Sequence, residues 1–494
     1  MRGGLKRPLR PWFASVVAAG SLALAVSSAA ARDPGGSSLQ KAIDRVLDRP
    51  AFAPGFWAVE VRSLRTGRIL YARNADKNMK PASTTKLVTT AAALDAFGPD
   101  DRLRTTVETA GRLDGMGRVL SDVYLVGRGD PNLSGRFTDG RITAAFEDLA
   151  DALRAQGVRR IEGRLVGHEG LFRGDRRGDD WAWGDLVWWY GAEVSALGFN
   201  DNSADLKVTP GERAGDPVLV ERNPVSSYYR LVSTATTSPA AMTSDLRIDR
   251  PLGSNLIRIS GTFPVGLKPW ENSVALEDPA RYAATVFAEV LAAKGMVVAG
   301  AVETSSDPMP GGLRVLAAHD GPPLSEVLKG VNKPSQNLHA EMLLRLLGAR
   351  LKGDGSVESG HAAVGEFLLR SGVHPERWSL QDGSGLSRSD ILSAHEMVSL
   401  LAAMDRHRYA AVFRDSLPIA GVDGTLKNRM KGTPAEGRVV AKTGSLRHVN
   451  ALGGYVTPRS GDRLVFYMVS NHNPGPGSEV TGAMDEICNL LVGR

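Results

Sequence analysis

Hydrophobic positions follow helical or strand spacing near the start of the chain. Apolar residues three and four apart predict a helix over residues 39–46 and another over 83–97, which Gly98-Pro99 ends. Between these helices, alternation of apolar and polar residues predicts strands over 56–61 and 68–71. This succession of helices and strands is typical of an α/β region.

The pattern changes between about residues 104 and 278. Short β-like runs such as 123–126 and 256–259 alternate there with Gly, Pro and Asp residues, which favour turns. Helix and strand spacing then returns, with helices over 279–294 and 338–347 and strands over 438–441, 451–456 and 464–470. We therefore predict an α/β (α+β) domain that is built from both ends of the chain and interrupted by a β-rich insert.

Residues 1–31 have the three-part layout of a secretory signal peptide. Basic residues precede an apolar run over 12–26, and the segment ends in Ala29-Ala30-Ala31. A membrane-spanning helix needs about 20 apolar residues, so this run is short for a permanent anchor. We predict export and cleavage, with no integral membrane association afterwards.

The composition is that of a soluble protein. Hydrophobic residues make up 42% and charged residues 23% of 494 residues, which excludes a multi-span membrane protein, a disordered chain and a fibre. The net charge of +6 includes the basic residues of the signal segment, so the mature chain is almost neutral and nucleic-acid binding has no electrostatic basis. The only cysteine, Cys488, cannot form an internal disulfide, and the helical spacing around it predicts a buried thiol.

The first candidate catalytic motif is Ser83-Thr84-Thr85-Lys86, at the start of the second predicted helix. Residues three apart share a helix face, so the Ser83 hydroxyl and the Lys86 amine can meet. A serine needs a base to become a nucleophile, and a neutral lysine can serve. The motif alone is weak, because residues 38–41 match it too, without other chemistry nearby.

Two further motifs follow along the chain. Ser335-Gln336-Asn337 precedes the predicted helix over 338–347, and Lys442-Thr443-Gly444 ends a predicted strand. Each could by itself be a helix cap or a turn. The order Ser-x-x-Lys, Ser-x-Asn, Lys-Thr-Gly is typical of active-site serine penicillin-binding enzymes and class A β-lactamases.

Spacing distinguishes these two classes. Ser335 follows Ser83 by 252 residues, a gap that a compact β-lactamase has no room for and that an insert explains. The sequence resembles the penicillin-binding protein 4 type of D-alanyl-D-alanine carboxypeptidase and endopeptidase, peptidase family S13. Three more segments agree with this resemblance, which spans nearly all of the mature chain: residues 127–133, 382–387 and 421–426. One small departure is Gln336, where many members carry Asp.

The resemblance implies a penicillin-binding/β-lactamase-like domain with an antiparallel sheet and helices. We accordingly expect four parts: the signal peptide (1–31), the first part of a transpeptidase-like domain (32–103), a β-rich insert (104–278) and the second part of the transpeptidase-like domain (279–494). The resemblance also implies a periplasmic location.

We expect Ser83 to attack the carbonyl of a D-Ala-D-Ala-like bond after Lys86 takes its proton. A lysine that is half neutral near pH 7 needs a pKa well below its usual value of about 10.4. A helix N-terminus contributes little to such a change, so burial and a second cation must supply most of it. Lys442 is the expected cation, and it also suits the terminal carboxylate of the substrate.

The remaining roles are those that the resemblance implies. Ser335 would relay a proton towards the leaving D-alanine, and Asn337 would orient the substrate amide and the catalytic lysine. The segment Lys442-Thr443-Gly444-Ser445 would bind the substrate carboxylate, with hydrogen bonds from the Thr443 and Ser445 hydroxyl groups. The backbone N–H groups of Ser83 and Ser445 would form the oxyanion hole.

The implied substrates are peptidoglycan stem peptides and their cross-links, and β-lactam antibiotics would inhibit by forming a slowly released acyl-enzyme. We expect no metal and no other cofactor, because none of the nine histidines falls in a metal-ligand pattern. Two alternatives remain: a β-lactamase, and a non-hydrolytic peptidoglycan-binding scaffold that retains the motifs. The sequence leaves the oligomeric state open.

An aromatic cluster lies in the predicted insert, with Trp181, Trp183, Trp188, Trp189 and Tyr190 within ten residues. One interpretation is a platform for a glycan or peptide strand. We favour the other, core packing where the insert meets the α/β domain.

Overall fold

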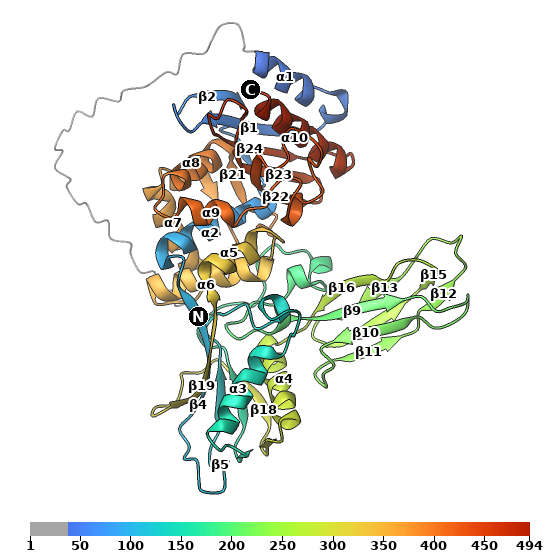
Figure 1. Cartoon of the computed structure of the whole chain (residues 1–494), viewed down its shortest axis with the longest axis vertical. Coiled ribbons are helices and arrows are strands. Elements are labelled where there is room, and N and C mark those ends of the chain that lie inside the picture. Colours follow the sequence, from blue (N-terminus) through green and yellow to red (C-terminus); the bar gives the residue numbers. More distant parts are fainter. Residues whose placement is uncertain (1–37) are drawn as a thin grey trace, which may run out of the picture. The chain divides into compact units, whose positions relative to one another are not determined.

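A computed structural model describes residues 38–494, so the predicted signal peptide lies outside the described residues. The two ends of this region share one five-stranded antiparallel sheet (Figure 1). Its strands, in order across the sheet, are β2 (Ile69–Arg73), β1 (Phe56–Ser63), β24 (Leu464–Asn471), β23 (Val449–Val456) and β22 (Val439–Leu446). The last strand of the chain, β24, is therefore the middle strand, and it pairs with β1 along its whole length.

Helices cover both faces of this sheet. On one side, α10 (Gly477–Val492) contacts β23 and packs against α1 (Ser38–Leu47). On the other, α8 (Ala394–Asp405) contacts β24 and β1. All residues of β24 are buried, and its alternate side chains join two different hydrophobic cores. Cys488 on α10 is fully buried, as its helical spacing predicts.

The core on the α8 side includes a layer of helices around α2 (Thr85–Phe97), which contacts α5, α6 and α7. The other helices of this layer are α5 (Leu324–Asn332), α6 (Asn337–Lys352), α7 (Val357–Arg370) and α9 (Ala410–Asp415). A small sheet consists of β20 (Trp378–Ser379), β21 (Ile391–Ser393) and β3 (Asn78–Met79). The helix predicted over 83–97 is present, but its first turn is the 3-10 turn η2 (Ala82–Thr84).

The middle of the chain forms another hydrophobic core. Its larger sheet has the order β18 (Val302–Ser305), β8 (Leu165–His168), β6 (Val123–Val126), β4 (Arg102–Thr109) and β19 (Arg314–Pro323). A smaller sheet has β17 (Val297–Val298), β7 (Arg160–Ile161) and β5 (Arg118–Val119). The helices α3 (Ala144–Ala155) and α4 (Pro279–Ala293) pack on these strands. Because α4 and β17–β19 belong to this core, we propose that the insert extends to about residue 323.

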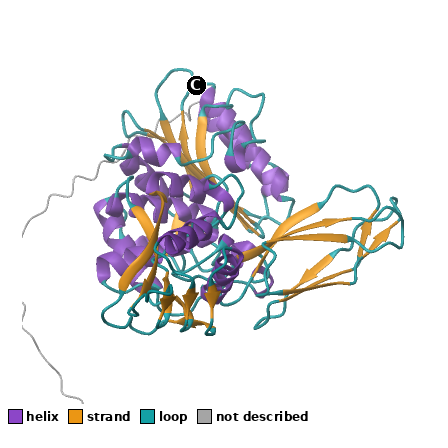
Figure 2. Ribbon diagram, turned by 60° about the horizontal axis from the view of Figure 1, so that its bottom comes forward, coloured by secondary structure: helices purple, strands orange, loops and turns teal. Residues whose placement is uncertain are grey.

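The remaining strands lie between residues 203 and 275, and we call this segment the arm. One sheet has β10 (Leu219–Asn223), β9 (Ser203–Thr209) and β16 (Trp270–Ala275). Another has β11 (Arg230–Ser233), β14 (Leu256–Ser260) and β13 (Arg247–Asp249), and β12 (Thr236–Ser238) pairs with β15 (Thr262–Pro264). Figure 2 shows the arm as strands and loops without a covering helix.

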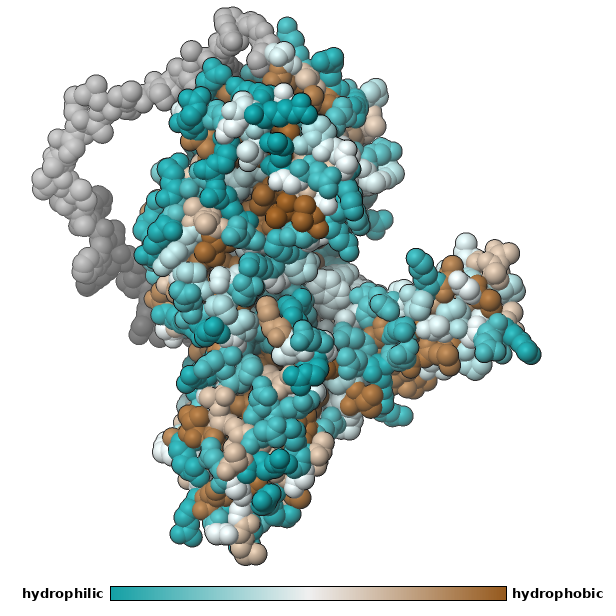
Figure 3. All heavy atoms as spheres, viewed as in Figure 1, coloured by the Kyte–Doolittle hydropathy of each residue, from teal (hydrophilic) through white to brown (hydrophobic). Residues whose placement is uncertain are grey.

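The face of the molecule seen in Figure 3 is mostly hydrophilic, with hydrophobic residues in small separate groups. Such scattered apolar residues are normal for a protein in contact with water. Within residues 38–494, no helix combines the length and the apolar composition needed to cross a membrane.

Candidate active site

Ser83 lies in the turn η2, directly before α2. The turn begins at Ala82, whose φ of 50° is left-handed, and the Thr84 hydroxyl donates a hydrogen bond to the Pro81 carbonyl at 2.6 Å. Lys86 follows in the first turn of α2, and its Nζ lies 2.9 Å from Ser83 Oγ. The structure thus brings the serine and the lysine of the first motif into hydrogen-bond contact.

Lys86 is fully buried and its ammonium group is surrounded by oxygen acceptors. Besides contacting Ser83, Nζ donates to Asn337 Oδ1 at 2.6 Å and to the backbone carbonyl of Ser384 at 2.7 Å. Burial lowers the pKa of Lys86 to about 7. This lowered pKa favours a neutral amine near neutral pH, the form in which a lysine can act as a base.

Ser335 and Asn337 lie at the start of α6. Ser335 has a left-handed φ of 68°, and its Oγ accepts a hydrogen bond from Lys442 Nζ at 2.9 Å. Asn337 is the first residue of the helix, and its Nδ2 donates to the backbone carbonyl of Tyr190 at 2.8 Å. The second motif is therefore joined to β22 on one side and to the insert on the other.

Lys442 is fully buried on β22 and also donates to the Thr443 carbonyl at 2.8 Å. Burial lowers the pKa of Lys442 well below its usual range, and the positive charge of Lys86 lowers it further. Burial is therefore the main cause that lowers the pKa of both lysines, ahead of the expected repulsion between their ammonium groups.

Gly444 lets β22 pass close to the turn that carries Ser83. A Cβ atom on Gly444 would lie 2.6 Å from the carbonyl oxygen of Pro81 and 3.2 Å from the backbone nitrogen of Ser83. A larger residue would therefore push the strand and the turn apart. An oxyanion hole formed by the N–H groups of Ser83 and Ser445 requires such an approach of the two backbones.

Hydroxyl groups lie beside the Lys-Thr-Gly motif. The Oγ1 atoms of Thr443 and Thr425 are 2.8 Å apart, and Ser445 is exposed to solvent. Thr425 belongs to the segment 421–426, for which sequence reasoning assigned no role. That segment is held in place by an ion pair of 2.5 Å between Asp423 and Lys333.

A second feature that sequence reasoning left without a role is the turn over residues 382–387. Its Ser384 carbonyl accepts from Lys86, and a Cβ on Gly385 (φ 81°) would lie 1.9 Å from the carbonyl oxygen of Ala82. Asp382 shapes the turn, because its carboxylate accepts from the backbone N–H groups of Ser384, Gly385 and Ser387. The sequence Asp-Gly-Ser-Gly over residues 382–385, part of the segment that agrees with the family resemblance, was the available signal for this contact.

Three buried carboxyl groups, those of Glu341, Asp382 and Asp390, act on the charge of Lys86. Burial raises the pKa of Glu341 to about 7, and the neighbouring charge of Asp382 raises it further. Burial also raises the pKa of Asp390 well above its usual range. The charges of all three groups raise the pKa of Lys86, against the larger effect of burial.

The aromatic cluster of the insert has no uniform role. Trp181 is buried in the core of the helical layer and donates from Nε1 to Asp382 at 3.0 Å, in agreement with the packing interpretation. Trp183, in contrast, is 79% exposed. Tyr190 meets the site through its backbone carbonyl, a contact that no side-chain pattern could have indicated.

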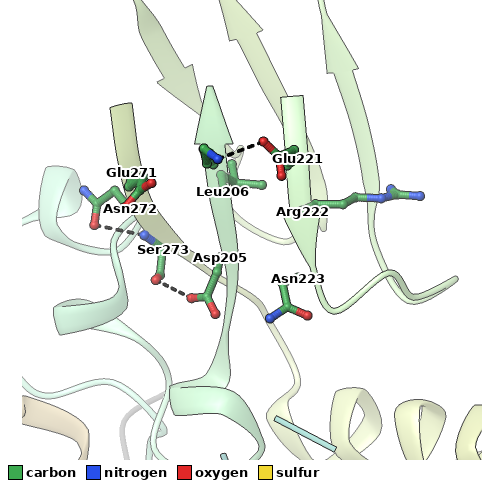
Figure 4. Close-up of a pocket in the computed structure, with 9 residues that line it drawn as sticks. Asp205, Leu206, Glu221, Arg222, Asn223, Glu271, Asn272 and Ser273 are labelled. Atoms are coloured by element: carbon green, nitrogen blue, oxygen red, sulfur yellow. Dashed lines mark hydrogen bonds and ion pairs between the residues drawn. The ribbon is translucent and has the colours of Figure 1, made fainter. Parts of the chain in front are cut away.

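A surface pocket of about 460 Å³ lies away from these motifs, on the arm (Figure 4). Polar side chains of β9, β10 and β16 line it, including the Lys207–Glu221 ion pair of 3.1 Å. In the described part of the chain, no group of three or more His, Cys, Asp or Glu residues is arranged to hold a metal ion.

Comparison with known proteins identifies the family of the chain. Residues 39–490 match the D-Ala-D-Ala carboxypeptidase 3 (S13) family. The chain is 36% identical to a D-alanyl-D-alanine carboxypeptidase of Actinomadura sp. (strain R39), over 96% of this chain and 88% of that protein. It is also similar to the crystal structure of penicillin-binding protein 4 from Haemophilus influenzae, with a TM-score of 0.81 and 24% identity over 92% of this chain and 100% of that one. Another crystal structure of that protein, complexed with a β-lactam, has a TM-score of 0.75 and 23% identity over 92% of this chain and 98% of that one.

The chain belongs to the D-Ala-D-Ala carboxypeptidase 3 (S13) family. It is an enzyme, a serine-type D-Ala-D-Ala carboxypeptidase, as the motifs predict. The mixed α+β architecture with antiparallel sheets and helices confirms the predicted fold class.

Proposed function

We propose that this enzyme hydrolyses the D-Ala-D-Ala bond of peptidoglycan stem peptides, and the related bond of their cross-links, through an acyl-enzyme on Ser83. The observation that carries the proposal is the 2.9 Å contact between Ser83 Oγ and the buried Lys86 Nζ. Because the pKa of Lys86 is about 7, the lysine can act as a base at neutral pH.

In the acylation step, Ser83 Oγ attacks the carbonyl carbon while its proton moves to Lys86 Nζ. The negative charge that develops on the carbonyl oxygen is stabilised by the backbone N–H groups of Ser83 and Ser445. Asn337 holds Lys86 through its 2.6 Å hydrogen bond and orients the substrate amide. The C–N bond then breaks, and the nitrogen of the leaving D-alanine takes a proton.

Ser335 relays that proton. Its hydroxyl contacts Lys442 Nζ at 2.9 Å. It can accept a proton from Lys442 as it donates its own proton to the leaving amine. Lys442 and the hydroxyl groups of Thr443 and Ser445 bind the terminal carboxylate of the substrate. Water then attacks the ester carbon while its proton passes through Ser335 back to Lys442. Lys86 returns the proton it holds to Ser83 Oγ, and the ester bond breaks.

A β-lactam acylates Ser83 by the same attack, but its opened ring stays attached to the acyl group and hydrolysis is slow. The proposed setting is the periplasm, where an exported enzyme meets its peptidoglycan substrate. The scaffold alternative does not explain the buried Lys86 and Lys442, whose desolvation is costly and brings no benefit to a protein that only binds.

The experiment is covalent labelling with a fluorescent penicillin, together with release of D-alanine from a stem peptide. We expect a labelled band and D-alanine release from the wild-type protein, and neither from Ser83→Ala. Folded wild-type protein that binds peptidoglycan but shows neither activity would establish the scaffold alternative instead. Fast release of the label with cleavage of the antibiotic would indicate a β-lactamase.

A further inference from the structure

Three consecutive residues of the insert have a left-handed backbone that non-glycine residues rarely adopt. The φ angles of Asn200, Asp201 and Asn202 are 47°, 52° and 54°. Asparagine and aspartate tolerate this conformation better than other side chains, but such strain persists only where surrounding contacts impose it. In this turn, Asn202 Oδ1 accepts from the Phe199 N–H at 3.1 Å, and the Asn200 N–H donates to the Leu133 carbonyl at 2.9 Å.

This strained turn contacts the motif Ser335-Gln336-Asn337, in which Ser335 also has a left-handed backbone. Gln336 Nε2 donates to Asp201 Oδ2 at 2.6 Å. The same oxygen accepts from Arg136 at 2.6 Å, so a second group of the insert fixes the carboxylate. Gln336 stands between Ser335, whose φ is 68°, and the first residue of α6.

The insert therefore holds the motif at two neighbouring residues. Asp201 accepts from the side chain of Gln336, and the Tyr190 carbonyl accepts from the side chain of Asn337. Within residues 38–494, the hydrogen bond from Lys442 Nζ is the one side-chain hydrogen bond of Ser335 Oγ, so the position of this hydroxyl depends on the backbone of its motif.

We propose that Asp201 is a positioning residue for Ser335: it holds Gln336 so that the left-handed backbone keeps the Ser335 hydroxyl on Lys442. This inference rests on the proposed proton relay through Ser335. It gives the insert a part in the chemical step, although none of the three catalytic motifs lies on the insert.

The expected effect is on turnover more than on binding. Ser83, Lys86 and the Lys-Thr-Gly strand do not contact Asp201, so the nucleophile and the carboxylate site remain in place without it. Misplacement of a relay group by about 1 Å can lower a rate by up to about 10²-fold. Loss of the Asp201 contact should thus lower kcat about tenfold and change KM less than about twofold.

The first test is Asp201→Gly, because glycine adopts a positive φ freely and the turn keeps its backbone while it loses the carboxylate. The matched control is Asp139→Gly, at an exposed aspartate of the insert whose φ is also 52°. The measurements are kcat and KM for D-alanine release and the midpoint of thermal unfolding. We expect Asp201→Gly to lose turnover and Asp139→Gly to match the wild type.

A second test reverses the hydrogen bond. Gln336→Glu puts a carboxylate against Asp201 and should also lower kcat about tenfold. Adding Asp201→Asn supplies an amide that donates to the new carboxylate, and should return kcat to within about threefold of the wild type. Such rescue would not follow if residue 201 only stabilised the fold.

The outcomes separate this inference from the proposed function. Wild-type protein that neither forms a penicilloyl adduct nor releases D-alanine would overturn the proposed function. Active wild type with unchanged kcat in Asp201→Gly, or with no rescue in the Gln336→Glu/Asp201→Asn pair, would overturn the positioning role alone. If Asp201→Gly does not fold, the reversed pair still decides.

Discussion

The five-stranded sheet and the arm are both β-structure, yet they differ in what surrounds them. Every residue of β24 is buried between helices, whereas residues of β10 in the arm alternate between exposed and partly exposed. The three sequence motifs lie on or beside the five-stranded sheet and its helices, where packing on all sides fixes each side chain. Precise chemistry is thus placed on the densely packed region, and the insert contributes through a few directed hydrogen bonds.

Replacement of Lys86 by alanine, in the densely packed region, should cause the largest loss of activity. It removes the buried base from the packed region, and general-base catalysis is worth roughly 10²–10⁴-fold. We expect the rate of penicillin acylation in Lys86→Ala to fall about 10³-fold, as measured by stopped-flow or by mass spectrometry of the adduct. A near wild-type rate would contradict the assignment of the base.

Gly444→Ala tests the tight approach of β22 to Ser83. The added methyl group would lie 2.6 Å from the Pro81 carbonyl and must separate the two backbones that form the oxyanion hole. Loss of one oxyanion contact lowers kcat by about 10²–10³-fold, and we expect about 10²-fold in steady-state kinetics. Gly461→Ala is a poor control because Gly461 has a left-handed φ of 82°, unlike Gly444. Gly482→Ala in α10, where the added Cβ meets no atom within 4 Å, is preferable.

The pH dependence should report the burial of Lys86. Only the neutral amine accepts the proton, and the pKa of Lys86 is lowered to about 7, so acylation should rise about tenfold per pH unit below 7 and level off above it. Burial raises the pKa of Glu341, and the charge of its carboxylate raises the pKa of Lys86. In Glu341→Gln the midpoint should therefore move to lower pH. A profile that falls with rising pH would rule out a neutral lysine base.

The smallest effect is expected in the arm. Lys207 and Glu221 form an ion pair whose side chains are 41% and 69% exposed. Exposed pairs contribute about 0–1 kcal/mol, so Lys207→Gln should change the free energy of unfolding by less than about 0.5 kcal/mol and leave kcat unaltered. Denaturant unfolding and D-alanine release check this. A large loss of activity would show that the arm takes part in catalysis.

Sequence reasoning succeeded where a local rule links residue spacing to geometry. The three-residue spacing of Ser83 and Lys86 predicted their contact, and the apolar periodicity predicted the helix around buried Cys488. The fold class followed from strand and helix patterns at the two ends of the chain. The order of the motifs was enough to predict that Ser335 and Lys442 belong to the same site, although they are 107 residues apart in the sequence.

The rest depends on contacts that side-chain patterns do not encode. Tyr190 and Ser384 meet the site through backbone carbonyl groups, which every residue has. The return of helical spacing at residue 279 predicts the end of the insert at residue 278, but the spacing of α4 does not indicate which hydrophobic core the helix joins, and α4 packs in the second one. The left-handed turn at Asp201 has no periodic signature.

The central place of β24 in its sheet has a consequence for the order of events during synthesis. A ribosome makes the turn that carries Ser83 long before this strand, yet β1 and β23 can join into one sheet only when β24 lies between them. The growing chain therefore carries a complete set of motifs for some time without a working hydrolase. We therefore expect a chain that stops before β24 to lack activity, because β22 and β23 cannot then join the sheet of β1.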